Sequence, residues 1–182
     1  MTNVSVVPRA RELGVTTDYG IYFTIENALP MGSSVDITFP RDYFSVDSLS
    51  AITCSGVSAN VETPTCAFPI QTKIDPTTGL LVDRFNVLRL SGAILTSIEP
   101  NAELAFLLSG VTNPASSLDT ETIAREFSIE TVSPSGYPID SSVDVKFEIG
   151  CVSPCATCKD ERTQCLSCLR LDDGTPLFFL EE

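Results

Sequence analysis

The sequence predicts an all-β fold, an immunoglobulin-like antiparallel β-sandwich followed by a small C-terminal disulfide-rich module. Apolar residues alternate with polar ones at a period of two up to residue 150, which is typical of half-buried strands. Five of the seven cysteines then fall between Cys151 and Cys168. Because no helical pattern separates the strands, parallel crossovers are not expected. We therefore expect a sandwich domain over residues 1–150 and a cysteine-rich module over residues 151–182.

The period-two segments define the expected strands. Residues 21–25 and 35–39 flank turn-forming residues 29–32, and we expect them to form a hairpin. Further strands are expected at residues 51–54, 87–90, 103–108, 126–132 and 143–149, with a turn at 75–79 and a single helical turn at 117–125. The expected inner face comprises Ile21, Phe23, Ile25, Val35, Ile37, Phe39, Leu104, Phe106, Leu108, Phe127, Ile129, Val145 and Phe147.

Two cysteines precede the C-terminal cluster, Cys54 and Cys66. We expect them to form a disulfide, and we expect them to be too close in sequence to bridge the two sheets. A crosslink that closes a loop of this length stabilises the fold by about 3 kcal/mol. The sequence contains no tryptophan, whereas an antibody-type domain packs one against its inter-sheet disulfide. The chain is therefore expected to share the sandwich architecture without belonging to that family.

Composition and charge exclude several kinds of partner. The 182 residues are 43% hydrophobic, which is enough for a packed core. The formal net charge of -13 would repel phosphate backbones and anionic headgroups, so we expect no nucleic-acid partner and no binding to a membrane surface. No segment approaches the roughly 20 apolar residues of a membrane span. The first residues lack the layout of a signal peptide, so a secreted protein would be represented here by a mature or partial chain.

The sequence contains no histidine, the commonest general base and metal ligand. Serine and cysteine triads that depend on imidazole are therefore excluded. Adjacent carboxylates occur at Asp172-Asp173 and Glu181-Glu182, where solvated acids in turns and tails are the simpler interpretation. We expect no enzymatic activity and no cofactor.

The C-terminal residues CVSPCATCKDERTQCLSCLRLDDGTPLFF resemble a furin-like, or growth-factor-receptor type, cysteine-rich repeat, as found in tandem in large surface proteins of ciliates and other protists. The resemblance implies that Cys151 pairs with Cys158 and that Cys155 pairs with Cys165. Cys168 is then unpaired or intermolecular, unless the chain continues beyond residue 182. The upstream segments VDITFPRDYF, NVLRLSG, AELAFLLSGVTNPASS and REFSIETVSPSGYPID are similar to β-sandwich modules of the same proteins.

The same cysteines permit a second chemistry. The two pairs Cys155–Cys158 and Cys165–Cys168 have the spacing of zinc knuckles and could supply four thiolates. The six-residue spacer between them is short for two opposed knuckles, and Cys151 would be left without a role. Because dense cysteines are typical of secreted domains, we favour disulfides, expect no metal, and expect the protein to be secreted or exposed at the cell surface.

Three short segments suggest contacts with other molecules. Asn3-Val4-Ser5 is an acceptor sequence for an N-linked glycan. Apolar segments near both ends lack hairpin partners, so each either packs within its own module or completes the sheet of a neighbouring subunit. These candidate assembly strands comprise Val4, Val6 and Val7, and Leu177, Phe178, Phe179 and Leu180.

Together, these features predict a non-enzymatic extracellular structural protein whose subunits assemble head to tail into a surface filament or coat. A head-to-tail contact does not close on itself, so it propagates. The partners would be further copies of the chain or other surface proteins. One alternative is a spacer fragment of a large cell-surface receptor or adhesin, and a second is an intracellular zinc-binding protein.

Overall fold

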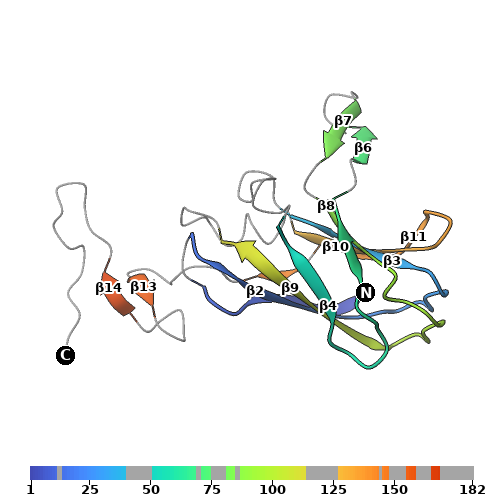
Figure 1. Ribbon diagram of the computed structural model, residues 1–182, viewed down its shortest axis with the longest axis horizontal. Coiled ribbons are helices and arrows are strands. Elements are labelled where there is room, and N and C mark those ends of the chain that lie inside the picture. The colour runs from blue at the N-terminus through green and yellow to red at the C-terminus, as the bar shows by residue number, and fades with distance from the viewer. Residues whose placement is uncertain are drawn as a thin grey trace.

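The fold is all-β in the parts of the chain that the structure describes. The computed structural model describes residues 1–11, 14–39, 51–68, 71–74, 81–84, 87–113, 127–143, 145–147, 155–158 and 165–168. Two five-stranded sheets form the two layers of a sandwich, and two further sheets have two strands each (Figure 1). This confirms the predicted fold class. The expected turns at 75–79 and 117–125, and residues 177–180, lie outside the described residues.

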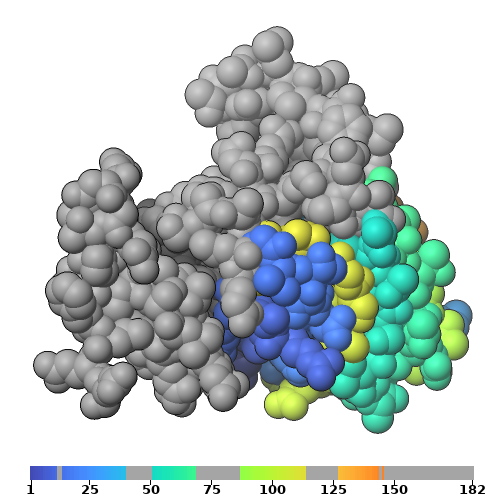
Figure 2. Space-filling view, turned by 60° about the vertical axis from the view of Figure 1, so that its left-hand side comes forward, coloured from blue at the N-terminus to red at the C-terminus, as the bar shows by residue number. Residues whose placement is uncertain are grey.

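The first sheet has the strand order β12-β1-β2-β9-β4. Its strands are β12 (Lys146–Phe147), β1 (Thr2–Pro8), β2 (Thr16–Thr24), β9 (Glu103–Thr112) and β4 (Thr53–Gly56). Figure 2 shows the N-terminal strands in blue, β9 in yellow and β4 in teal lying side by side. All neighbours are antiparallel except β1 and β12, which run in the same direction. The first and last strands of the sandwich therefore point toward the same end of the sheet.

The second sheet has the order β11-β10-β3-β8-β5, and its neighbouring strands are antiparallel. Its strands are β11 (Pro138–Ser142), β10 (Ser128–Val132), β3 (Ser34–Thr38), β8 (Val87–Ser91) and β5 (Thr65–Ala67). The register aligns Glu130, Asp36 and Arg89 in one row across three strands. On this row, Arg89 donates two hydrogen bonds of 2.7 Å to the carboxylate of Asp36. This bidentate bond raises the pKa of the Arg89 guanidinium and keeps it charged.

Two small antiparallel sheets complete the described structure. The strands β6 (Gln71–Ile74) and β7 (Leu81–Arg84) pair with each other and flank the expected turn. The strands β13 (Cys155–Cys158) and β14 (Cys165–Cys168) pair so that the backbone of Cys155 lies opposite Cys168 and that of Cys158 opposite Cys165. The bonds implied by the furin-like resemblance, and the domain boundary at residue 150, stay predictions.

The core lies between the two large sheets, as period-two alternation requires. The predicted inner-face residues from Ile21 to Val145 are buried. The side chain of Phe147 is not among those that the structure describes. Each sheet contributes one aromatic pair to this core, Phe23 with Phe106 at 6.2 Å between ring centroids in the first sheet and Phe39 with Phe127 at 5.0 Å in the second. The core also contains residues that alternation did not identify, namely Tyr19, Leu29, Leu88, Leu90, Ile94 and Ile98.

The predicted hairpin of residues 21–25 and 35–39 is wrong. The first segment lies in β2 of the first sheet and the second in β3 of the second sheet, so the intervening residues cross between the layers. Stacked sheets lie about 10 Å apart, a distance that this connection spans easily. The expected strand at 143–149 is also shorter in the described residues, where β12 comprises Lys146–Phe147 and the Val143 side chain is 69% exposed.

The prediction that Val4, Val6 and Val7 form a strand available to a neighbouring subunit is wrong. Their strand, β1, is hydrogen-bonded to β2 on one side and to β12 on the other. Val4 and Val6 are buried in the core of the same sandwich, and only Val7 is exposed. The partner strand β12 is distant in sequence, so a search for a local hairpin could not identify it.

Candidate functional site

Two connections between the sheets lie at one end of the sandwich. Residues 25–33 and 92–102 both cross from one sheet to the other at the same end. These crossings are joined by reciprocal backbone hydrogen bonds of 2.9 Å between Leu29 and Ile98. The turn at residues 133–137 connects β10 to β11 at this end as well. We call this end, comprising residues 25–33, 92–102 and 133–137, the loop end.

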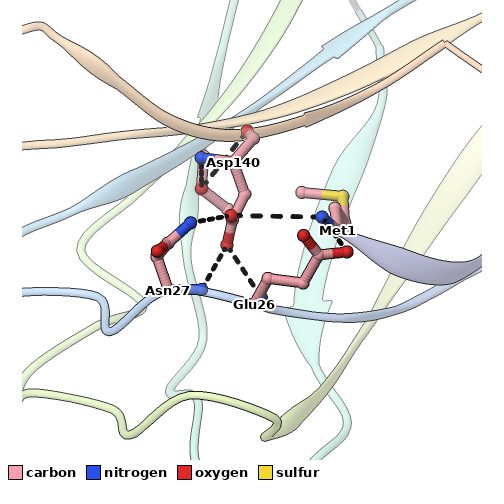
Figure 3. Close-up of polar contacts among 5 residues, drawn as sticks. Met1, Glu26, Asn27 and Asp140 are labelled. Atoms are coloured by element: carbon pink, nitrogen blue, oxygen red, sulfur yellow. Dashed lines mark hydrogen bonds and ion pairs between the residues drawn. The ribbon is translucent and has the colours of Figure 1, made fainter.

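A buried carboxylate holds the loop end together. Asp140 on β11 accepts hydrogen bonds from the backbone amides of Glu26 and Asn27, at 3.1 and 3.2 Å, and from the Asn27 side-chain amide at 2.7 Å. Figure 3 shows the carboxylate of Asp140 reaching from one sheet toward the chain that follows β2 in the other. The backbone amide of Asp140 donates in turn to Thr131 Oγ1 at 3.0 Å. This network ties the two sheets together at the loop end.

The first residue of the described chain also reaches this network. The Met1 amino group lies 2.8 Å from Glu26 Oε1 and 4.0 Å from Asp140 Oδ1 (Figure 3). It therefore supplies positive charge beside two carboxylates, one exposed and one buried. The charge pairing places the start of β1 firmly at the loop end.

Three large apolar side chains are exposed at the loop end. Met31 is 64% exposed, Leu95 58% and Tyr137 73%. The backbones that carry them are held by hydrogen bonds, from the Gly32 amide to the Ile94 carbonyl at 2.8 Å and from the Tyr137 amide to Ser133 Oγ at 3.0 Å. Exposed apolar groups on an ordered backbone are typical of contact surfaces.

A cleft of about 390 Å³ adjoins Leu95, between the loop that follows β4 and residues 93–99. Leu95 lines the cleft together with two carboxylates, Glu62 and Glu99. Both glutamates are exposed, as is Glu103 at the start of β9. The loop end is therefore apolar at its tips and acidic at its rim.

The opposite end carries different chemistry. Asn113 is buried there, where it accepts a hydrogen bond from the Tyr19 hydroxyl and donates one of 2.9 Å to the Ala10 carbonyl. Burial raises the pKa of the Tyr19 hydroxyl far above its usual range. On the surface of this end lie the exposed side chains of Arg9, Val15 and Val143. Among the described residues of this end, Arg9 is paired with Asp18 at 3.7 Å and keeps a side chain that is 83% exposed.

Cys54 and Cys66 form a disulfide, and the expectation that they are too close in sequence to bridge the two sheets is wrong. Cys54 lies on β4 at the edge of the first sheet and Cys66 on β5 at the edge of the second. The residues between them cross from one layer to the other. This crossing is ordered by hydrogen bonds from the Val57 amide to the Ala105 carbonyl and from the Glu62 amide to the Ala93 carbonyl, both 2.9 Å.

The other predicted site residues are distributed over the molecule. Asn3 is exposed on β1, whereas Leu177, Phe178, Phe179 and Leu180 lie outside the described residues. Within the described part of the chain, no group of three or more Cys, Asp or Glu side chains is arranged to hold a metal ion. The described residues contain no helix of the length and apolarity needed to cross a bilayer. The loop end was not predicted as a site, because its residues come together only through the crossings between sheets.

Comparison with known proteins identifies no family. No family model matches the chain, and no curated protein shows a significant match. Among solved structures, the chain is similar to a type II cohesin domain from the cellulosome of Acetivibrio cellulolyticus, at 13% identity and a TM-score of 0.25. The alignment covers 79% of this chain and 91% of that domain. At this identity and TM-score, the likeness says nothing about function.

Proposed function

We propose that the protein is a non-enzymatic, extracellular structural subunit that assembles head to tail through the two ends of its sandwich. The observation that carries the proposal is the parallel pairing of β1 and β12. β1 starts at the loop end, where Met1 lies beside Glu26. Because β12 runs in the same direction as β1, both strands point toward the opposite end. A module with this polarity presents two different surfaces, which a propagating contact requires.

The chemistry of the two ends supports the proposal. Glu62 and Glu99 line the cleft of the loop end with Leu95, and Glu103 is exposed at the start of β9, whereas Arg9, paired with Asp18, is exposed at the opposite end. Opposite charges at the rim of an interface favour one orientation of docking, and buried apolar groups at its centre supply most of the affinity. A second copy of the chain provides both complementary surfaces.

An extracellular setting is supported by cysteine chemistry. The Cys54–Cys66 disulfide and the cysteine density after residue 150 are typical of oxidising compartments. A disulfide-rich tail would give stiffness to a module too small for a large apolar core. The absence of histidine from the whole sequence supports a role without imidazole-dependent catalysis.

Sedimentation velocity and electron microscopy of the full chain test the assembly. We expect the wild type to form larger species and fibres as its concentration rises. The triple variant Met31→Ser, Leu95→Ser, Tyr137→Ser should stay monomeric, because it removes the apolar tips without touching the core. Val7→Thr, which changes an exposed residue on the outer face of the first sheet, is the matched control and should assemble like the wild type. Equal assembly of the wild type and the triple variant would contradict the proposal.

The same polarity suits the alternative function, a spacer within a large surface receptor or adhesin, because modules joined end to end form a line. A wild type that stays monomeric at every concentration would favour the spacer. Thiol titration and metal analysis of the purified chain separate both functions from the intracellular zinc protein, which would carry free or metal-bound thiols in place of disulfides.

A further inference from the structure

We infer that Asn3 carries an N-linked glycan whose first sugar lies in a groove on the outer face of the first sheet, against the ring of Tyr22. This inference rests on the extracellular part of the proposed function, since glycan transfer requires the secretory route. It does not depend on assembly. Asn3 is the only asparagine of the 182 residues that stands in an Asn-x-Ser/Thr sequence, so any N-linked glycan belongs to it.

The backbone displays Asn3 outward. The pairing of β1 with β2 shifts register between Thr2 and Ser5, and within this irregularity Asn3 has a φ of 52°. Asparagine is one of the few residues that adopt this left-handed conformation readily. The Asn3 side chain is exposed, while its neighbour Val4 faces the core. A sugar on Asn3 therefore leaves the packing of β1 intact.

A groove adjoins the Asn3 side chain. It has a volume of about 360 Å³, and Asn3 is one of its lining residues, together with Tyr22, Thr24, Ser58, Glu103 and Ala105. Its walls offer hydroxyl and carboxylate oxygens beside an aromatic ring, the combination that orients a polar ligand with apolar faces. This face of the sheet, formed by β1, β2, β9 and β4, is the one on which the coloured strands lie side by side in Figure 2.

Tyr22 is placed to contact a sugar. Gly20 lies two residues before it on the same face, and a Cβ atom at Gly20 would come within 2.6 Å of the Tyr22 ring atom Cε2. The ring therefore lies along the sheet over Gly20, and the side chain is 45% exposed. An aromatic face held open to solvent stacks against the C–H groups of a sugar ring at little entropic cost.

The modification is a group transfer from a lipid-linked oligosaccharide diphosphate. Asn3 Nδ2 forms a bond to C1 of the first N-acetylglucosamine and loses a proton, while the bond between C1 and the diphosphate oxygen breaks. The lipid diphosphate leaves with the electron pair. The hydroxyl of Ser5 completes the acceptor sequence.

Secretion of the full chain from a eukaryotic cell line, behind a signal peptide, tests the modification. We expect a mass above that of the bare polypeptide, which peptide-N-glycosidase F removes. Asn3→Gln and Ser5→Ala should abolish the added mass, and Ser5→Thr should retain it. Secreted wild type without the added mass, or an enzyme-sensitive mass in Asn3→Gln, would overturn the inference. Neither result depends on whether the protein assembles, so a failure here is distinct from a failure of the proposed function.

Thermal unfolding before and after enzymatic deglycosylation tests the position of the sugar. If the sugar stacks on Tyr22, removal should lower the Tm by about 2–4 °C, the shift that about 1 kcal/mol produces in a domain of this size. The shift should persist in Tyr22→Phe, which retains the ring, and vanish in Tyr22→Ser. Because each variant is compared with its own deglycosylated form, the direct effect of the substitution on stability cancels. An equal shift in all three proteins would place the sugar away from Tyr22.

Discussion

Cys54 and Cys66 are joined across the sandwich, with their Cα atoms 6.0 Å apart and each cysteine on an edge strand of a different sheet. The bond links the edge strands β4 and β5 and so closes one side of the core between the two sheets. On the opposite side, β11 and β12 are edge strands of the two sheets and are close in sequence. The two sheets are therefore connected covalently on both sides, by the disulfide on one side and by the chain between β11 and β12 on the other.

Loss of this disulfide should lower stability substantially. We expect the double variant Cys54→Ala, Cys66→Ala to unfold with a free energy about 3 kcal/mol below that of the wild type, because the unfolded chain regains the freedom of the closed loop. Urea denaturation followed by circular dichroism measures the difference. An unchanged urea midpoint would show that the backbone hydrogen bonds of Val57 and Glu62 hold the crossing without the bond.

Asp140→Asn should weaken the loop end. The carboxylate accepts three hydrogen bonds, and an asparagine would direct its own amide hydrogens toward at least one of the same donors. We expect a loss of about 1–3 kcal/mol in the free energy of unfolding. The control is Asp18→Asn, which removes an exposed ion pair of 3.7 Å with Arg9 and should cost about 0–1 kcal/mol. Similar losses in the two variants would contradict the anchoring role of Asp140.

Tyr19 should make the folded protein sensitive to alkaline pH. Burial raises the pKa of its hydroxyl above the ordinary value of 10.0, so above that pH the unfolded chain releases a proton that the folded chain retains. The unfolded state then binds fewer protons than the folded state, and stability falls as pH rises, by up to about 1.4 kcal/mol per pH unit. Below pH 10 this contribution to pH dependence is absent.

The comparison of wild type with Tyr19→Phe isolates this effect. The variant keeps the ring in the core but has no group to ionise, so its stability should decline less steeply above pH 10. Chemical denaturation at several alkaline pH values measures both slopes. Parallel pH profiles for the two proteins would show that Tyr19 does not titrate on unfolding in this range.

Peptide mapping without reductant should reveal the bonds of the cysteine module. The furin-like resemblance implies Cys151 with Cys158 and Cys155 with Cys165, leaving Cys168 to be labelled by an alkylating reagent. Cleavage after Lys159 and Arg162 separates the two halves of the module, so a bond between them appears as linked peptides. A link between Cys155 and Cys168, whose backbones lie opposite each other, would replace the implied pairing. Labelling of all five cysteines would exclude an oxidised module.

The amino-acid sequence by itself determined several of the strands of the sandwich and which of their faces are buried. Alternation at period two reports the polarity of the two faces of a strand. For that reason the alternate residues Ile21, Phe23 and Ile25, and Val35, Ile37 and Phe39, were correctly assigned to the core. The same alternation carries no information about the partner of a strand. The predicted hairpin between these segments failed on that point.

Tertiary structure alone decided how the strands combine into two sheets. The pairing of β1 with β12, the bond between Cys54 and Cys66 across the layers, and the contact of Asp140 with the chain after β2 all join segments that local patterns treat separately. Each depends on burying the apolar faces of both sheets against each other, a requirement that concerns the whole chain at once. Strand identity is a local property of the sequence, whereas strand partnership is set by the common core.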